Sequence, residues 1–135
     1  MIRYPLVACI LLHLASVASA QQLPEGNLRP VVLTEERTQI WRTYDLNPDC
    51  TAAGDLAIKV TKPGKGHVEF EENLGFSTFP QQQFPQHYHC NTQQTFGTSV
   101  FYTSAPGFKG TDDLELEVTS ARGASRKVKI RVTVK

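Results

Sequence analysis

Long apolar runs are nearly absent from this sequence of 135 residues. The main one, residues 6–17, is too short for a transmembrane helix, and no later segment reaches about 18 apolar residues, so we expect no membrane span. The sequence also lacks G-x-S-x-G, P-loop and H-E-x-x-H motifs, which would indicate a hydrolase, a nucleotide-binding enzyme or a metalloprotease. We therefore expect a protein that is not an enzyme and needs no cofactor.

Sulfur-containing residues are scarce, with three cysteines and one methionine. Met1 and Cys9 fall within residues 1–20, where a positive start, an apolar stretch and a small-residue ending at Ala20 predict a cleaved secretory signal peptide. A lipoprotein signal ending at Cys9 is the less favoured alternative. Cleavage of these 20 residues from 135 leaves 115 and removes the methionine, which excludes a thioether copper site.

Two cysteines remain after cleavage, Cys50 and Cys90. An even cysteine count in an exported protein predicts a disulfide, and two free thiols are the alternative. Closing a loop of about 40 residues would stabilise the fold by roughly 4 kcal/mol. These features predict a periplasmic or secreted protein.

The chain shows no excess of either charge. It has 14 Lys and Arg and 13 Asp and Glu, and loss of Arg3 with the signal peptide leaves 13 of each. A chain with no net charge has no overall field to attract nucleic acid. We expect no nucleic-acid partner and a monomer.

The remaining pattern is that of β-structure. Residues 21–30 contain two prolines and predict a loose N-terminal lead to a domain over residues 31–135. Short segments rich in β-branched and aromatic residues, several with period-two alternation, follow between turn signals. The predicted strands are 31–33, 38–45, 56–61, 67–71, 99–103, 113–118 and 127–134. About seven short strands and no helix favour an all-β fold of two packed sheets.

The last two predicted strands have complementary charges. The outward residues of the first are acidic (Asp113, Glu115, Glu117), and those of the second are basic (Lys127, Lys129, Arg131). In an antiparallel hairpin these rows would face each other, and each pair would contribute about 0.2–1 kcal/mol. Because a one-residue slip would bury the charges, the pattern also fixes the register.

Three segments resemble a known family. "KPGKGHVEF" (62–70), "VFYTSAPGFKGTDDLELEV" (100–118) and "VKIRVTV" (128–134) resemble the bacterial Ig-like, cadherin-like modules. The resemblance implies one antiparallel Ig-like β-sandwich in a small exported protein, and a fold of this kind implies no particular function. Its motif residues are Tyr102, Pro106, Gly107, Phe108, Gly110 and Asp112.

These motif residues have structural interpretations. We expect Gly107 and Gly110 in tight turns and Tyr102 facing inward. Phe108 would close one end of the core, and Asp112 would accept backbone N–H groups.

A long stretch, residues 72–97, has no strand pattern and is predicted to be an insertion loop. Loops of this length are usually functional or disordered, and four aromatic residues argue against disorder. Either these aromatics plug the end of the domain, or some contact a protein, peptide or glycan of the cell envelope. The candidate binding residues are Phe76, Phe79, Phe84 and Tyr88.

The same stretch contains His87 and His89, which form an H-x-H followed by Cys90. On an extended backbone these two imidazoles would share a face and could bind copper(II) or zinc, with His67 as a further ligand. A closed zinc site needs four ligands, and the sequence offers at most three candidates here, which weakens the metal hypothesis. The leading hypothesis is therefore a non-enzymatic binding or structural module of the envelope. A periplasmic metal-binding protein is the alternative.

Overall fold

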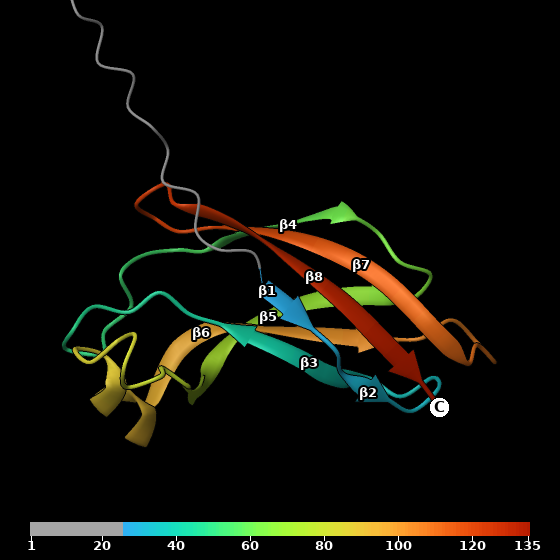
Figure 1. Cartoon of the computed structure of the whole chain (residues 1–135), viewed down its shortest axis with the longest axis horizontal. Coiled ribbons are helices and arrows are strands. Elements are labelled where there is room, and N and C mark those ends of the chain that lie inside the picture. Colours follow the sequence, from blue (N-terminus) through green and yellow to red (C-terminus); the bar gives the residue numbers. More distant parts are fainter. Residues whose placement is uncertain (1–25) are drawn as a thin grey trace, which may run out of the picture.

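The computed structural model describes residues 26–135, which form two β-sheets and contain no α-helix. One sheet has the order β1 (Gly26–Leu28), β8 (Ser125–Val134), β7 (Gly110–Thr119), β4 (Ala57–Lys62), and β2 (Val31–Val32) also pairs with β8. The other has the order β3 (Thr38–Thr43), β6 (Gln94–Thr103), β5 (His67–Phe76). The sheets lie face to face (Figure 1). The predicted signal peptide lies outside the described residues.

The all-β prediction is confirmed for residues 26–135, but the strands there number eight and are not all antiparallel. Residues 26–28 of the expected loose lead form β1, and β1 and β2 both pair with β8 in parallel. The prolines near residues 26–28 suggested a loop. Leu28 packs against the core, and burial of this apolar side chain holds the segment in the sheet. Among residues 26–135 no helix is long and apolar enough to cross a bilayer.

The main core lies between the two sheets. Val100 and Tyr102 of β6 are fully buried, as predicted for Tyr102. They meet the inward row of β7 and β8, which consists of Leu114, Leu116, Val118, Val128, Ile130, Val132 and Val134. The alternation in these strands therefore identified the buried face correctly.

The β7–β8 hairpin has the predicted register. Asp113 lies opposite Arg131, Glu115 opposite Lys129 and Glu117 opposite Lys127. Arg131 donates two hydrogen bonds to the Asp113 carboxylate, at 2.8 and 3.1 Å. These bonds lower the pKa of Asp113.

The β5–β6 hairpin is longer than the sequence predicted. All ten residues of β5 pair with β6, and the paired region extends to Phe76 and Gln94. The predicted irregular stretch 72–97 is thereby reduced to residues 77–93. In Figure 1 this connection, with its single 3-10 turn (η1, Tyr88–Thr92), lies beside the far end of the hairpin.

Candidate functional site

The disulfide anchors the loop of residues 77–93. Cys50 and Cys90 are bonded, as predicted, with an S–S distance of 2.09 Å. Cys50, Cys90 and Leu46 form a small second core against which Tyr44 and Phe79 pack. The loop is therefore attached to the segment that follows β3.

Phe79 is the aromatic centre of this second core. Its ring lies 4.9 Å from the ring of Tyr44, 5.5 Å from Phe84 and 5.1 Å from His87, centroid to centroid. Of the four aromatics proposed for binding, Phe79 thus fills the end of the domain. Phe76, Phe84 and Tyr88 remain exposed.

Polar contacts fix the loop in addition. The Asn91 Oδ1 atom accepts hydrogen bonds from the Ser77 hydroxyl and the Phe79 N–H, at 2.9 and 2.8 Å. Its amide nitrogen donates to the Phe79 carbonyl at 2.9 Å. The Tyr44 hydroxyl oxygen accepts from the Thr78 N–H at 2.7 Å. Residues 77–79 are therefore held by Asn91 from within the loop and by Tyr44 from the segment after β3.

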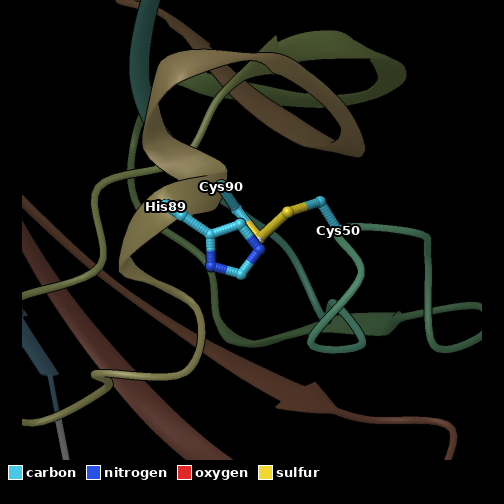
Figure 2. Close-up of side chains that lie close together, drawn as sticks. All are labelled: Cys50, His89 and Cys90. Atoms are coloured by element: carbon cyan, nitrogen blue, oxygen red, sulfur yellow. Dashed lines mark hydrogen bonds between the residues drawn. A yellow bond between two sulfur atoms is a disulfide. The ribbon is translucent and has the colours of Figure 1, made fainter.

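The two loop histidines do not lie on an extended backbone. His87 precedes η1 and has its Nε2 atom 3.1 Å from the Leu46 carbonyl oxygen, whereas His89 lies within η1. The His89 ring lies against the disulfide, with Nε2 3.9 Å from the Cys90 sulfur (Figure 2). His67 is on β5 with its Nε2 atom 3.8 Å from a Glu69 carboxylate oxygen. The geometry assumed for two-histidine chelation is therefore not found.

Among residues 26–135, one group of three potential metal ligands comes together: Cys50, His89 and Cys90. Both sulfurs belong to the disulfide, whereas a metal-binding cysteine is a thiolate. The intact disulfide therefore leaves one imidazole in this group, which is too few ligands for a closed zinc site.

Toward the loop, the inner face of the β5–β6 hairpin exposes apolar side chains. Leu74 lies directly opposite Phe96 in the register, and Phe70 and Phe76 follow on the same face of β5 because strand side chains alternate with period two. Their exposures are 40% for Phe70, 53% for Leu74, 56% for Phe76 and 63% for Phe96. We call these four residues the hairpin surface. The sequence prediction included Phe76 alone, because Glu72 interrupts the alternation.

Carboxylates adjoin the hairpin surface. Asp45, Asp55 and Glu72 line a cavity of about 130 Å³ together with Phe96. One carboxylate oxygen of Asp45 is buried and accepts no hydrogen bond from the described residues. The open end of the domain therefore combines exposed apolar side chains with negative charge.

The outer face of the same hairpin is polar. The Arg37 guanidinium lies 3.6 Å from the centre of the Phe101 ring. It donates hydrogen bonds to Glu69 and Glu71 at 2.8 and 3.0 Å. These hydrogen bonds raise the pKa of Arg37, and the one to Glu69 lowers the pKa of that carboxyl group.

Arg42 crosses this outer face next to them. Its guanidinium donates to the Asn73 and Thr95 carbonyl oxygens at 2.9 and 2.8 Å, and to the side chains of Asn73 and Ser99. Burial lowers the pKa of Arg42. One arginine thus joins all three strands of the smaller sheet.

Two of the predicted motif residues, Tyr102 and Asp112, meet the turn between β4 and β5. Asp112 is buried and accepts hydrogen bonds from the Lys65 and Gly66 N–H groups at 2.8–2.9 Å, and from the Tyr102 hydroxyl at 2.7 Å. Burial, and then the bond to Asp112, raises the pKa of Tyr102. Gly107 lies in a turn with a φ of +69°, as predicted. The prediction of a tight turn at Gly110 is wrong, because Gly110 is the first residue of β7, although its φ of +125° still favours glycine.

A second concavity lies on the outer face of the larger sheet. It has a volume of about 290 Å³. Its charged lining residues are Arg29, Lys62, Asp113, Glu115, Lys129 and Arg131. Both signs of charge are interleaved there, and the lining has no aromatic residue. It therefore differs in character from the apolar hairpin surface.

No protein-family model matches the chain, and no curated protein matches it. Among solved structures, the chain is similar to the 2,6-sialyltransferase of the Vibrionaceae bacterium Photobacterium sp. JT-ISH-224, determined with CMP and lactose. The identity is 9%, the TM-score is 0.36, and the match covers 84% of this chain but 18% of the enzyme. A likeness this slight carries no conclusion about fold or activity.

Proposed function

We propose that this chain is an exported, non-enzymatic binding module of the bacterial cell envelope, and that its hairpin surface contacts another protein. The observation that carries the proposal is the exposure of Phe70, Leu74, Phe76 and Phe96 on one face of two paired strands. Contiguous exposed apolar surface rimmed by polar groups is characteristic of protein interaction sites. The neighbouring carboxylates of Asp45, Asp55 and Glu72 supply such a rim.

The loop contributes a support and a secondary contact. Phe79 and the disulfide hold the loop in place, while Phe84 and Tyr88 are each 45% exposed. Aromatic side chains are enriched in the centres of protein interfaces. The proposed contact region therefore extends from the hairpin surface toward these two rings.

The proposed compartment and fold type rest on the sequence together with the disulfide. The N-terminal pattern of residues 1–20 supports export, and a disulfide between Cys50 and Cys90 is consistent with the periplasm or the exterior. Two packed β-sheets with the motif residues at a strand-connecting turn support an Ig-like assignment. Metal binding through His87 and His89 remains the alternative function, and no contact in the loop favours it.

Site-specific photocrosslinking in intact envelopes tests the proposal. A photoreactive residue would replace Leu74 or Phe96, and the matched control would carry it at Val31, which is 58% exposed on β2. We expect discrete protein adducts from the two hairpin positions and none from the control. Absence of adducts at the hairpin positions, or the same adducts at all three, would refute the proposed contact surface.

Two exposed-site variants give an independent check. Leu74→Ser and Phe96→Ser should leave stability within about 0.5 kcal/mol of the parent, because substitutions at exposed positions have small effects. We expect each to abolish the adducts formed from a photoreactive residue at the other position. Retained adducts in stably folded variants would show that apolar contact does not drive the interaction.

A further inference from the structure

Strand β5 is an open edge of the smaller sheet. It pairs with β6 along one side, and no other described strand lies along its second side. In an antiparallel pair every second residue directs its N–H and C=O groups away from the partner. About half the residues of β5 therefore present free backbone donors and acceptors to any strand that approaches.

The other outer edges are protected, and at β1 and β2 the strands have only three and two residues. β3 and β4 have six residues each, and both are interrupted by a register shift. β4 also carries Lys59 and Lys62. Short length, bulges and lysines are the usual means by which proteins prevent edge-to-edge pairing.

β5 has none of these three features. It has ten residues, its register with β6 is continuous, and it contains no lysine or proline. Among the described strands, β5 is thus the long, regular edge that remains available for pairing.

The two faces of β5 define the chemistry of a suitable partner. The inner face presents Phe70, Leu74 and Phe76, with Glu72 between them, and the outer face presents Glu69 and Glu71. An added strand would place alternate side chains beside these two rows. Apolar residues are favoured on the inner side, and basic residues are favoured opposite the glutamates.

Arg37 does not neutralise this charge. It bonds to both Glu69 and Glu71, so one positive charge is shared between two carboxylates. Glu72 has no bonded cation among the described residues, and Asp45 and Asp55 lie near it around the same cavity. Arg42 adds a second positive charge beside Asn73 of β5. The three glutamates of β5 therefore exceed these two arginines by one negative charge, and Asp45 and Asp55 increase the excess.

This charge disfavours a second copy of the chain as the partner. Antiparallel pairing of β5 with β5 of another molecule would bring the glutamates at 69, 71 and 72 of both strands together. Like charges directly opposite one another destabilise strand pairing. A segment with basic residues on the outer side gains from Glu69 and Glu71, two of the positions that oppose self-association.

We propose that β5 binds an extended segment of another protein, with alternating apolar and basic residues, as a fourth strand of the β3–β6–β5 sheet. The inference rests on the proposed function, because it specifies the partner's chemistry and binding mode for the hairpin surface. Backbone hydrogen bonds along β5 supply affinity, and the side chains beside Phe70, Glu72 and Leu74 supply selectivity.

A synthetic peptide of alternating valine and lysine, matched to the ten residues of β5, serves as the probe. The control peptides are an alternating valine–glutamate sequence and the valine–lysine sequence with every backbone nitrogen methylated. The methylated peptide cannot donate backbone hydrogen bonds. Binding is measured by NMR titration of the full folded chain, together with hydrogen exchange of the β5 amides. We expect binding of the unmodified basic peptide alone, with slowed exchange of the outward-facing β5 amides.

A charge-reversal variant sharpens the test. Glu71→Lys should weaken binding of the basic peptide about tenfold, because Glu71 is exposed on the outer face of β5, where the peptide lysines would lie, and an attractive cross-strand pair becomes repulsive. Glu36→Lys changes the total charge equally at an exposed residue outside β5 and should leave the affinity unchanged. Equal weakening in both variants would indicate non-specific attraction and overturn the proposal.

The outcomes separate the inference from the proposed function. Equal binding of the methylated and unmodified peptides, absence of binding by either, or preference for the acidic peptide each overturns strand addition. A dimer in sedimentation analysis that Phe70→Lys dissociates would identify a second copy as the occupant and also overturn it. The envelope crosslinks at Leu74 and Phe96 are independent of all these results, and their loss would refute the proposed function itself.

Discussion

Replacement of Tyr102 by phenylalanine tests how far the buried Asp112 carboxylate stabilises this fold. Tyr102 and Asp112 are 0% and 3% exposed, and the tyrosine hydroxyl donates to the carboxylate at 2.7 Å. The N–H groups of Lys65 and Gly66 donate to the same carboxylate and remain in the variant. A hydrogen bond to a charged group contributes about 1.5–3 kcal/mol, so we expect Tyr102→Phe to lower the free energy of unfolding by about 2 kcal/mol.

Urea denaturation at neutral pH measures this loss. With a slope of about 2 kcal/mol/M, typical of a small protein, the midpoint should fall by about 1 M. Tyr88→Phe is the matched control, because Tyr88 is 45% exposed and should change stability by less than about 0.5 kcal/mol.

The pH dependence of this stability loss provides a second, independent test of the buried hydrogen bond. Burial and the Asp112 bond raise the pKa of Tyr102 in the folded chain, so the folded state keeps the phenol protonated where an unfolded tyrosine, with a pKa of about 10, ionises. The resulting stability is fully present below about pH 10 and is lost as the pH rises further. At pH 10.5 the difference between parent and Tyr102→Phe should therefore be smaller than at pH 7 by about 0.8 kcal/mol.

Two results would refute this reasoning. A neutral-pH loss no larger than that of Tyr88→Phe would mean that the buried hydrogen bond adds nothing to stability. A difference between parent and Tyr102→Phe that stays constant or widens from pH 7 to pH 10.5 would mean that the phenol ionises as readily in the folded chain as in the unfolded one.

Two further stability predictions follow from the loop and from the smaller sheet. Replacing Cys50 and Cys90 by serine should lower the free energy of unfolding by about 4 kcal/mol in urea titrations, since the bond closes a separation of 40 residues; an unchanged midpoint would contradict this. Gly97→Ala should lower it by about 2 kcal/mol through overpacking, because a Cβ there would lie 2.7 Å from the Thr43 carbonyl oxygen. Gly26→Ala, whose Cβ would meet its nearest side-chain atoms at 3.7 Å, is the control, and equal losses in the two alanine variants would contradict the steric argument.

The β7–β8 hairpin could be predicted in detail because its alternation is uninterrupted. Leu114 through Val118 and Val128 through Val134 place every apolar residue on one face, and the acidic and basic rows opposite fix the register. The apolar alternation and the charge rows there indicate the same strands and the same register. Such agreement is what allows prediction from sequence alone.

The end of the β5–β6 hairpin could not be predicted because its sequence breaks the strand pattern for reasons that lie in another strand. Gly75 and Gly97 lie within this stretch, and glycine weakens strands. A Cβ at Gly75 would lie 2.7 Å from the Arg42 guanidinium carbon, and one at Gly97 would lie 3.0 Å from a guanidinium nitrogen. These glycines therefore make room for a side chain that crosses from β3, and no local pattern in 72–97 contains that information.

The candidate site could be predicted only in part, because some of its features also depend on contacts with distant segments. The cysteine count identified the disulfide, which needs no knowledge of the fold. The separation of Phe79, which fills the second core, from the exposed Phe76 and Phe84 depends on contacts with Tyr44. Phe96 was missed because its exposure follows from its pairing with Leu74 across the hairpin.

The contacts of the loop also order the end of the hairpin surface. The Asn91 bonds to Ser77 and Phe79, and the disulfide at Cys90, tie the loop directly beyond the end of β5. An edge strand whose end is tied in this way loses little conformational entropy when a partner binds, and a binding surface ordered in advance gains affinity for that reason. Serine at Cys50 and Cys90 should then weaken binding of the valine–lysine peptide even where the chain remains folded, although neither cysteine lies on β5. Unchanged affinity in the folded double variant, measured in the same NMR titration, would show that the hairpin end is ordered without its loop.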